Sequence, residues 1–311
     1  YMCPVNTKEP LVELGTVVGK SYNTLESPYI IPRLVNTKNP VLDMSKAKLT
    51  TKYEKEDSTD YVVGDSLKEI ADKFSASVTA QANIMLFSGS ISTDFKRETK
   101  SEHEMAYCKA THLAIRKRIN FTDVDQCKDL LTDKFKENLN SLDVETFFKR
   151  YGTHLIVEAS LGGRLEFNFS REKKLHETKE SLEVEVKAGL GKALKTETSI
   201  SQSNALKELS NNNYTSSRVI GGMGLAITTF DSFNEQYKKW VDSLENEKNW
   251  QFCSIPNMDS LVPLWDFCET KDEKGRKRRN ELKRYYEEIV NLKGNVLQET
   301  ELYVKDIMFV N

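Results

Sequence analysis

The chain has 311 residues, of which 38% are hydrophobic and 30% charged, and its formal net charge is −2 at pH 7. This composition is typical of a globular protein that buries a core, and the length fits one large domain or two ordinary ones. The near-neutral charge excludes long-range attraction of the whole chain to an anionic partner, and the lack of any run of eighteen apolar residues excludes a membrane-spanning helix.

The first part of the chain favours strands and loops, with one short helix. Residues 1–60 are rich in proline and turn signals, which disfavour helices. Asp65 to Lys73 predicts a short helix that places Leu67 and Ile70 on one face. Residues 112–121 then alternate apolar and polar side chains, which predicts a strand.

Two helices and a long strand are expected next. One helix covers Asp123 to Asn138; the other has Asp143 as its N-cap and Gly152 as its C-terminal stop. A strand should then run from about Thr153 to Phe169. The pair Gly162-Gly163 lies inside it, and paired glycines in a strand mark a bend or a close backbone approach.

The last third is predicted to contain a strand followed by two helices. A strand is predicted from about Ser217 to Phe230, again with a glycine pair, Gly221-Gly222. Asp231 is expected to cap an amphipathic helix, and a further helix is predicted from about Lys277 to Leu292. The apolar residues of the first of these helices recur at helical spacing: Phe233, Tyr237, Trp240, Val241 and Leu244.

Two further segments, 76–86 and 182–190, alternate apolar and polar residues. Along a helix the apolar residues of the second segment would split between two opposite sides, whereas along a strand they share one face. Nine residues is also about the length of a tilted strand that crosses a bilayer. We therefore predict two sets of membrane-facing residues: Ala76, Val78, Ala80, Ala82, Ile84 and Leu86, and Leu182, Val184, Val186, Ala188 and Leu190.

The alternative for each segment is an ordinary half-buried strand with one face in water. The flanks of the second segment, 171–179 and 192–209, are charged, rich in serine and compatible with helix. Local preference and the period of hydrophobicity therefore disagree, and such disagreement is typical of functional or switching sites.

Other constellations give little support for chemistry. The stretch Gly15 to Ser21 has one residue too few between its glycines for a phosphate-binding loop. The histidines lack metal-ligand spacing, and no nucleophile has an evident partner, so we expect no catalytic residues, no metal, no cofactor and no enzyme activity. The segment Lys271 to Arg284 is strongly basic; it is either a solvated helix start, a contact for anionic headgroups or a protease site, and nucleic acid is disfavoured.

Five cysteines without C-x-x-C spacing argue against zinc. In a secreted protein the odd count leaves one thiol over, and Cys3 is the natural one. The short separation of Cys253 and Cys268 makes them the pair to consider for one local disulfide, although spacing alone does not give connectivity.

One motif stands between the two alternating segments. Tyr151-Gly152-Thr153-His154, an apolar residue and six further residues precede Gly162-Gly163. This arrangement resembles the signature of the membrane attack complex/perforin (MACPF) family. Three neighbouring stretches also follow in family order, so the resemblance covers roughly residues 10 to 292: they are 19–23, 219–222 and 237–244.

The resemblance implies an α+β fold like that of the cholesterol-dependent cytolysins, in which a bent four-stranded antiparallel sheet is flanked by two helical clusters that convert to β-hairpins. By position the clusters are about 65–105 and 171–215. Gly221 and Gly222 would lie at the bend, supported by Gly162 and Gly163. The signature residues would be structural: Tyr151, Gly152, Thr153 and His154. The domain would occupy residues 1–295, followed at 296–311 by a linker and the start of a C-terminal domain.

The function implied is that of a secreted toxin or immune effector that assembles into a homo-oligomeric ring or arc on a target cell membrane and inserts two hairpins per subunit into a large β-barrel. A hairpin alone in lipid exposes unpaired backbone groups, so closure with neighbouring copies follows from insertion itself. A lipid, glycan or protein receptor would be bound through an appended domain. The alternative is a non-lytic relative that keeps the fold for adhesion, complex assembly or delivery of an attached domain.

Overall fold

The computed structural model describes residues 17–25, 35–67, 69–70, 73, 104–196, 200–227, 230 and 232–289. The first alternating segment, with all six of its predicted membrane-facing positions, lies outside the described residues, and so do Cys3, Asp231 and residues 296–311.

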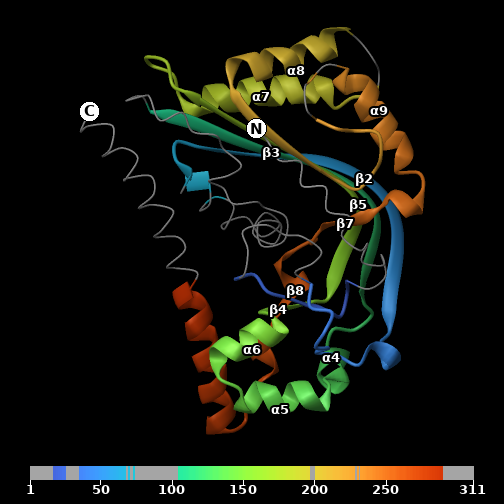
Figure 1. The fold of residues 1–311 in the computed structure, drawn as a ribbon, viewed down its shortest axis with the longest axis vertical. Helices are drawn as coiled ribbons and strands as arrows, with labels where there is room; N and C mark the ends of the chain where they lie inside the picture. Colours follow the sequence, from blue (N-terminus) through green and yellow to red (C-terminus); the bar gives the residue numbers. More distant parts are fainter. Residues whose placement is uncertain are drawn as a thin grey trace.

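A large antiparallel sheet runs through the molecule and bends along its length (Figure 1). Its strands, in spatial order, are β2 (Leu49–Gly64), β3 (Met105–Phe121), β5 (Glu158–Glu172) and β6 (Tyr214–Ile220). Beyond the point where β6 ends, β7 (Gln251–Ser254) pairs with the first part of β5. The strands β2 and β3 are long because each continues through the bend, as Figure 1 shows.

A smaller antiparallel sheet forms at the lower end of Figure 1. It contains, in spatial order, β1 (Ser21–Tyr22), β4 (His154–Ile156) and β8 (Leu261–Pro263). The chain passes from this sheet into β5 at Val157, whose N–H donates to the carbonyl of Ser260 at 2.9 Å. The single strand expected over 153–169 is therefore two strands that belong to different sheets.

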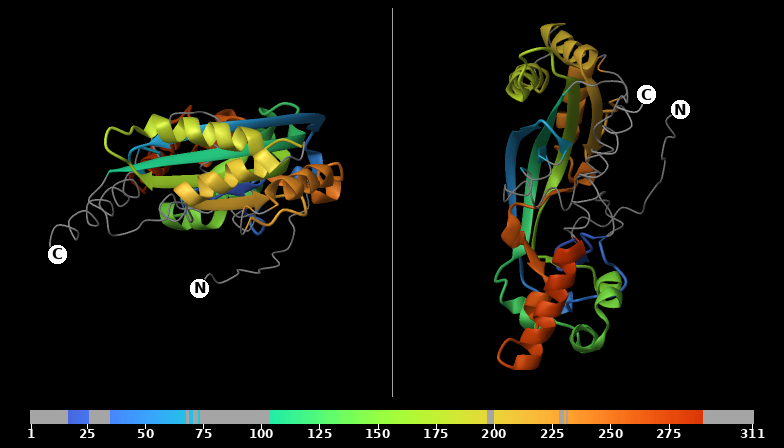
Figure 2. Two further views of the ribbon diagram at one scale, coloured as in Figure 1. Left: turned by 90° about the horizontal axis from the view of Figure 1, so that it is seen from above. Right: turned by 90° about the vertical axis from the view of Figure 1, so that its left-hand side faces the viewer.

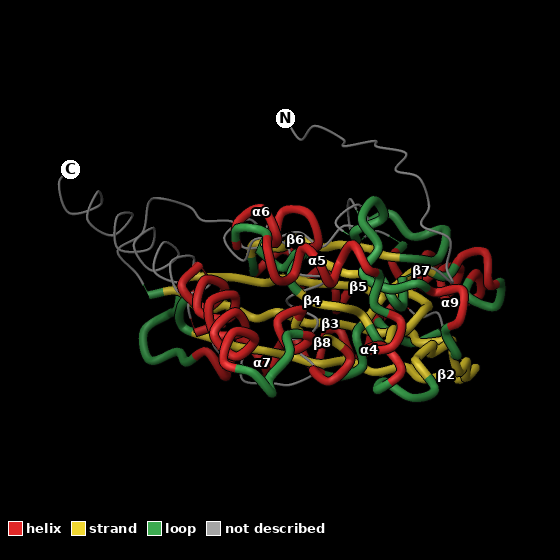
Figure 3. Tube along the Cα trace, turned by 90° about the horizontal axis from the view of Figure 1, so that it is seen from below, coloured by secondary structure: helices red, strands yellow, loops and turns green. Residues whose placement is uncertain are grey.

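The helices gather at the two ends of the large sheet (Figures 1 and 2). At one end lie α7 (Lys179–Ala193), α8 (Ile200–Asn212) and α9 (Phe233–Ser243). At the other end lie α4 (Gln126–Leu130), α5 (Asp133–Ser141), α6 (Val144–Tyr151) and a helix over 273–289, and the view from below shows α5 and α6 in front of the sheets (Figure 3). The described residues also contain four short 3₁₀ turns: Met44–Lys46, Glu247–Asn249, Met258–Ser260 and Leu264–Phe267.

Capping side chains set the ends of α5 and α6. The hydroxyl of Thr132 accepts from the N–H of Phe135 at 3.2 Å, and the carboxylate of Asp143 accepts from the N–H of Thr146 at 2.9 Å. Gly152 ends α6 with φ of 79° and donates its N–H to the carbonyl of Phe148. The predicted cap and stop of this helix are confirmed.

Two predicted elements have different bounds. The helix expected over 123–138 is interrupted, because Leu131 forms a β-bridge with Leu42 and Thr132 then starts α5 afresh. The strand expected over 217–230 begins earlier, at Tyr214, and ends at Ile220, because Gly221, Gly222 and Gly224 all adopt positive φ values. Ser232, rather than Asp231, precedes α9, and its side chain makes no capping hydrogen bond.

The disulfide considered between Cys253 and Cys268 is wrong, since both thiols are free and buried. Cys253 belongs to β7, which hydrogen-bonds to β5, and its Sγ contacts the carbonyl of Ser160 at 3.5 Å. Cys268 follows β8, which pairs with β4 in the smaller sheet. The two residues are close in sequence, but the strands before them belong to separate sheets.

The predicted fold class is confirmed. Helices and antiparallel sheets combine in an α+β architecture, and four strands of the large sheet pair in the order β2-β3-β5-β6. Two of the three connections between these strands are the ones expected to hold the helical clusters: residues 65–104, between β2 and β3, and residues 173–213, between β5 and β6. The second of these contains α7 and α8, within the range of about 171–215 expected for a helical cluster.

Candidate membrane-insertion apparatus

The upper part of the large sheet has two chemically different faces. On β5, Leu165, Phe167 and Phe169 alternate with Arg164, Glu166 and Asn168, and all six side chains are buried. The apolar face, called here the helix face, packs against α7, α8 and α9. Contacts across this interface include the rings of Phe167 and Phe233, with centroids 5.9 Å apart, and Lys187 of α7 over the ring of Tyr61 of β2 at 5.5 Å.

The opposite face, called here the charged face, carries a buried cluster around Glu166. Its carboxylate lies 2.8 Å from Arg164, 3.1 Å from Arg218 and 3.7 Å from Lys109. Burial by itself raises the pKa of Glu166, but the three cations outweigh burial and the net shift is downward. Glu166 is therefore an ionised carboxylate inside the fold, a feature that the sequence analysis missed.

Helix α7 holds the second alternating segment, and its apolar residues point in two directions. Leu182, Val186 and Leu190 are fully buried, at the i, i+4, i+8 spacing of one helix face. Val184 is 68% exposed and Ala188 is also exposed. The structure thus stores as a helix a segment whose apolar residues would share one face only in a strand.

Both glycine pairs meet around the indole of Trp240 from α9. A Cβ atom on Gly163 would lie 2.4 Å from this ring, and one on Gly222 would lie 2.3 Å from it. A Cβ on Gly221 would lie 2.3 Å from the carbonyl oxygen of Gly162. The close approach of α9 to the sheet therefore requires residues without side chains.

Irregular strand pairing occurs in the same region. The register shifts between Tyr53 and Glu56 on β2 and between Ile115 and Lys117 on β3, next to Gly162 of β5. Such bulges bend a sheet and increase its local twist. The indole N–H of Trp240 donates to the carbonyl of Gly221 at 2.8 Å, so α9 is held directly at the bend.

A second polar contact holds α9 to the sheet. His112 of β3 contacts the hydroxyl of Thr59 at 2.8 Å and the hydroxyl of Tyr237 at 3.1 Å, so it bridges β2, β3 and α9. Burial lowers the pKa of His112 to about 4, with the nearby Asp57 opposing that shift in part. The ring is neutral at physiological pH.

The residues of the Tyr-Gly-Thr-His motif join the lower elements. Tyr151 packs edge-on against Phe135, with centroids 5.1 Å apart, and a Cβ on Gly152 would lie 2.7 Å from the backbone of Tyr22. The N–H of Thr153 donates to the carbonyl of Tyr22 at 2.8 Å.

His154 lies between two aromatic rings, with centroids 5.5 Å from Trp265 and 5.3 Å from Tyr286. Burial lowers its pKa to about 4. The motif thus connects the end of α6, the smaller sheet and the helix over 273–289, at the far end of the large sheet from α7 (Figure 1).

A family model described as the MAC/Perforin domain matches residues 13–290. The chain belongs to the MACPF family. No curated protein matches it in sequence. Among solved structures, GNIP1Aa from Chromobacterium piscinae is similar with a TM-score of 0.67 at 19% identity, over 90% of this chain and 56% of that one. A MAC/Perforin-domain protein from Bacteroides thetaiotaomicron is similar with a TM-score of 0.61 at 14% identity, over 89% of this chain and 61% of that one.

These structural likenesses show the MACPF fold, and the chain spans less than two thirds of either protein's length. Family membership relates the chain to a family of pore-forming proteins. None of the helices in the described ranges combines the length and apolar character needed to cross a bilayer.

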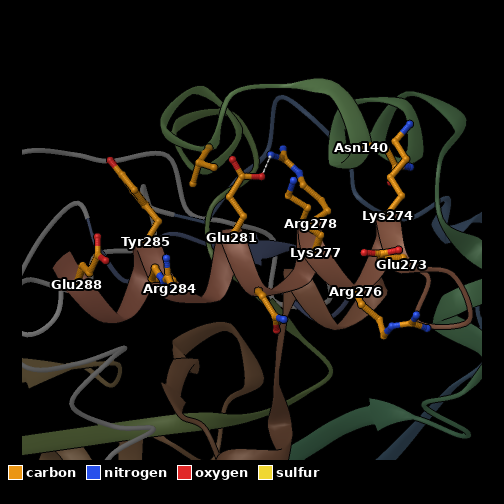
Figure 4. A pocket seen from close by; sticks show the side chains of 12 residues that line it. Asn140, Glu273, Lys274, Arg276, Lys277, Arg278, Glu281, Arg284, Tyr285 and Glu288 are labelled. Atoms are coloured by element: carbon orange, nitrogen blue, oxygen red, sulfur yellow. Dashed lines mark hydrogen bonds and ion pairs between the residues drawn. The ribbon is translucent and has the colours of Figure 1, made fainter.

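The basic segment predicted to have several alternative roles lines an open groove between α5, α6 and the helix over 273–289 (Figure 4). Three of its arginines have partners within the fold. Arg278 donates to the carbonyls of Leu139 and Leu142 at the end of α5 and pairs with Glu281 at 3.0 Å. Arg279 pairs with Asp266, and Arg276 donates to the carbonyls of Thr270 and Lys271. These contacts hold the three arginines within the fold, and the contact for headgroups and the protease site stay predictions.

Proposed function

We propose that this MACPF module forms pores: it assembles into a homo-oligomeric ring or arc on a membrane, and each subunit inserts two β-hairpins into a shared barrel. One observation carries the proposal. Helix α7 stores a nine-residue segment with the alternation of a membrane strand, in a connection between two neighbouring antiparallel strands of the sheet.

The topology makes conversion to a hairpin simple. Ser170 near the end of β5 pairs with Tyr214 at the start of β6, so residues 173–213 leave and re-enter the sheet at adjacent positions. If both strands lengthen into this segment, they form an antiparallel hairpin without any change in strand order. Gly64 and Tyr107 pair in the same way where residues 65–104 leave and re-enter, so the first hairpin would form between β2 and β3.

The alternation of β5 also predicts which sheet face the second hairpin would turn to lipid. Along β5 the even-numbered residues Arg164, Glu166 and Asn168 lie on the charged face. If the alternation continues unbroken, Val184 and the other apolar residues of 182–190, which are also even-numbered, extend this same face. The membrane side would then be opposite α9, and the helix face would line the lumen.

Oligomerisation would supply the missing strand partners. Among the described residues, β2 and β6 each pair with a strand on one side only, which leaves both edges of the upper sheet available for neighbouring copies. A barrel wide enough to hold water needs many more strands than one subunit contributes. A closed ring or a lipid-edged arc of copies would satisfy those edges.

The site of action proposed is the membrane of a target cell, reached by secretion, as for a toxin or an immune effector. Target choice would reside in a lipid, glycan or protein receptor bound by a domain outside this module.

Release of dye from liposomes tests the proposal, with the complete protein and a panel of lipid compositions. Concentration-dependent release, together with rings or arcs of the protein on the vesicles in electron micrographs, is expected. Binding without release across the panel would favour the alternative, a non-lytic protein that acts in adhesion, complex assembly or delivery.

A reversible tether tests the conversion of α7 itself. Cysteines at Tyr61 and Lys187, whose side chains face each other across the helix face, can be joined by a reducible cross-linker in a Cys3→Ser background. Release should stop when the tether is closed and return when it is reduced. Equal release in both states would show that α7 does not leave the sheet.

A further inference from the structure

A group of ion pairs joins the two segments expected to hold the helical clusters. Lys179, the first residue of α7, pairs with Glu69 and lies 3.5 Å from Asp65. Asp65 is the residue after β2, and Glu69 follows four residues later. Lys173, the residue after β5, lies 2.9 Å from Asp65 and 3.0 Å from Glu104, the residue before β3. Charged side chains therefore hold together the residues near which the two segments leave and re-enter the sheet.

The central pair in this group is partly shielded from water. The side chain of Lys179 is 20% exposed and that of Glu69 is 28% exposed. The hydrogen bond to Glu69 raises the pKa of Lys179. Although burial opposes the shift, the hydrogen bonds from Lys179 and Lys73 help to lower the pKa of Glu69 to about 2. The pair therefore stays ionised down to strongly acidic pH, and mild acid does not open it.

The sheet register shows which of these contacts survive when the strands lengthen. Met105 pairs with Glu172 across β3 and β5, and the N–H of Lys173 already donates to the carbonyl of Glu104 at 2.8 Å. Continued pairing places Lys173 and Glu104 directly opposite each other, so their ion pair is compatible with both the compact and the lengthened sheet.

Lys179 and Glu69 behave differently. Gly64 pairs with Tyr107 between β2 and β3, and Met105 pairs with Glu172 between β3 and β5. If both registers continue, Glu69 and Lys179 would be two strands apart across the sheet and offset by four residues along the strands. With strands about 4.8 Å apart and a rise of about 3.3 Å per residue, their Cα atoms would be roughly 16 Å apart. That distance is beyond the reach of the two side chains, so this contact exists only in the compact state.

We propose that Lys179 is a clasp, which by binding Asp65 and Glu69 couples the release of α7 to that of the turn that follows β2, at Asp65 to Ile70, so that neither is released alone. The inference rests on the proposed function for its consequence at a membrane, but the coupling itself is a property of the protein in solution. A coupling free energy between two segments is reciprocal, so a disturbance of one must appear in the other.

Hydrogen exchange in solution tests the coupling without any membrane. Leu190, fully buried near the far end of α7, is replaced by Ala to loosen the helix. With the clasp intact, exchange should accelerate in α7 and also in the peptide over residues 65–70, by roughly threefold to tenfold. In the Lys179→Gln background, the same replacement should accelerate α7 alone.

Two outcomes would overturn the coupling: no response of residues 65–70 to Leu190→Ala in either background, or the same response in both. Lys192→Gln is the matched control, because Lys192 is an exposed lysine of the same helix with no ion pair to another described residue. In the Lys192→Gln background, Leu190→Ala should accelerate exchange in residues 65–70 as much as it does with the clasp intact.

Dye-release kinetics test the consequence. Lys179→Gln should shorten the lag before release by roughly threefold to tenfold at equal membrane binding, because it removes a contact that exists only before insertion. Glu104→Gln, which removes an ion pair compatible with both states, should not shorten it. An unchanged lag in Lys179→Gln would refute the clasp, whereas a wild-type protein that never releases dye would refute the pore and leave the exchange experiment to decide the coupling.

Discussion

Helices α7 and α9 lie on the same face of the same sheet, but their sequences have different periods. Along α9 the large side chains Phe233, Tyr237 and Trp240 recur at helical spacing, and all three are buried. Along α7 the apolar residues occur at every second position, so Val186 is buried while Val184 is 68% exposed. The sequence of α9 therefore has the period of a helix, whereas the sequence of α7 has the period of a strand.

The difference indicates which part of the apparatus is permanent. Helix α9 buries the large side chains Phe233, Tyr237 and Trp240 of its apolar stripe and fills the space between the glycine pairs with Trp240. Helix α7 leaves part of its apolar surface in water, and a strand in lipid would bury all of it on one face. We therefore expect α9 to remain a helix when α7 converts, and four changes test this contrast.

The largest effect is expected from a carboxylate on the buried side of α7. Val186→Glu should destabilise the folded protein by about 3–5 kcal/mol, because the charge would be placed among apolar side chains without a partner. Val184→Glu, two residues away but exposed, should change the free energy of unfolding by less than about 0.5 kcal/mol. Urea unfolding of both variants measures the difference, and equal losses would contradict the two-sided packing of α7.

At the membrane the same Val184→Glu change should act strongly. A carboxylate on the lipid face of a strand costs up to about 2–4 kcal/mol, so dye release should fall at least about tenfold at equal vesicle binding. Ser181→Glu adds the same charge to the opposite, lumen-facing side of the strand and serves as the control. Equal inhibition by the two variants would mean that the alternation does not define a membrane face.

On the α9 side, His112 should make stability depend on pH. Its pKa is about 4 in the folded protein and about 6.5 in an unfolded chain, so between these values the unfolded chain binds the additional proton. Stability should therefore fall on acidification, by about 2 kcal/mol between pH 7 and pH 5 for this residue. His112→Gln should flatten that part of the profile measured by urea unfolding, and an unchanged slope would assign the dependence to other groups.

The smallest effect is expected from the hydrogen bond at the bend. Trp240→Phe keeps an aromatic ring between the glycine pairs but removes the N–H that donates to Gly221. The hydrogen bond should account for about 1 kcal/mol of the lost folded stability, measured by thermal unfolding, and the smaller ring adds the cost of the space that it leaves. Dye release should persist, since α9 is not expected to insert; loss of release at equal binding would show that α9 takes part in the conversion.

Much of this architecture could be predicted from local patterns. The Asp143 cap and Gly152 stop of α6, the alternation in β3 and the helical spacing in α9 each identify an element, because they depend on residues within one or two turns of each other. The long edge strand β2 could not be found in this way. Its sequence is mostly polar because most of the strand is exposed, so it has little apolar alternation to detect.

The groups that hold the candidate apparatus together were also missed. Glu166 has cationic partners on β3 and β6, and Lys179 meets Glu69 across 110 positions of the chain. From sequence alone, a charged residue in an alternating strand is expected to face solvent, because its ion-pair partners elsewhere in the chain are not known. Both glycine pairs were noted, but no local pattern indicates that one tryptophan of α9 contacts them both.

The sequence by itself determined the two periods of hydrophobicity, and with them the capacity of residues 182–190 to form a strand with one apolar face. Only the tertiary structure decided that this segment is held as a helix, because Leu182, Val186 and Leu190 find an apolar sheet face to cover. Periodicity is a property of neighbouring residues, whereas the choice between helix and strand depends on which surface the rest of the fold presents.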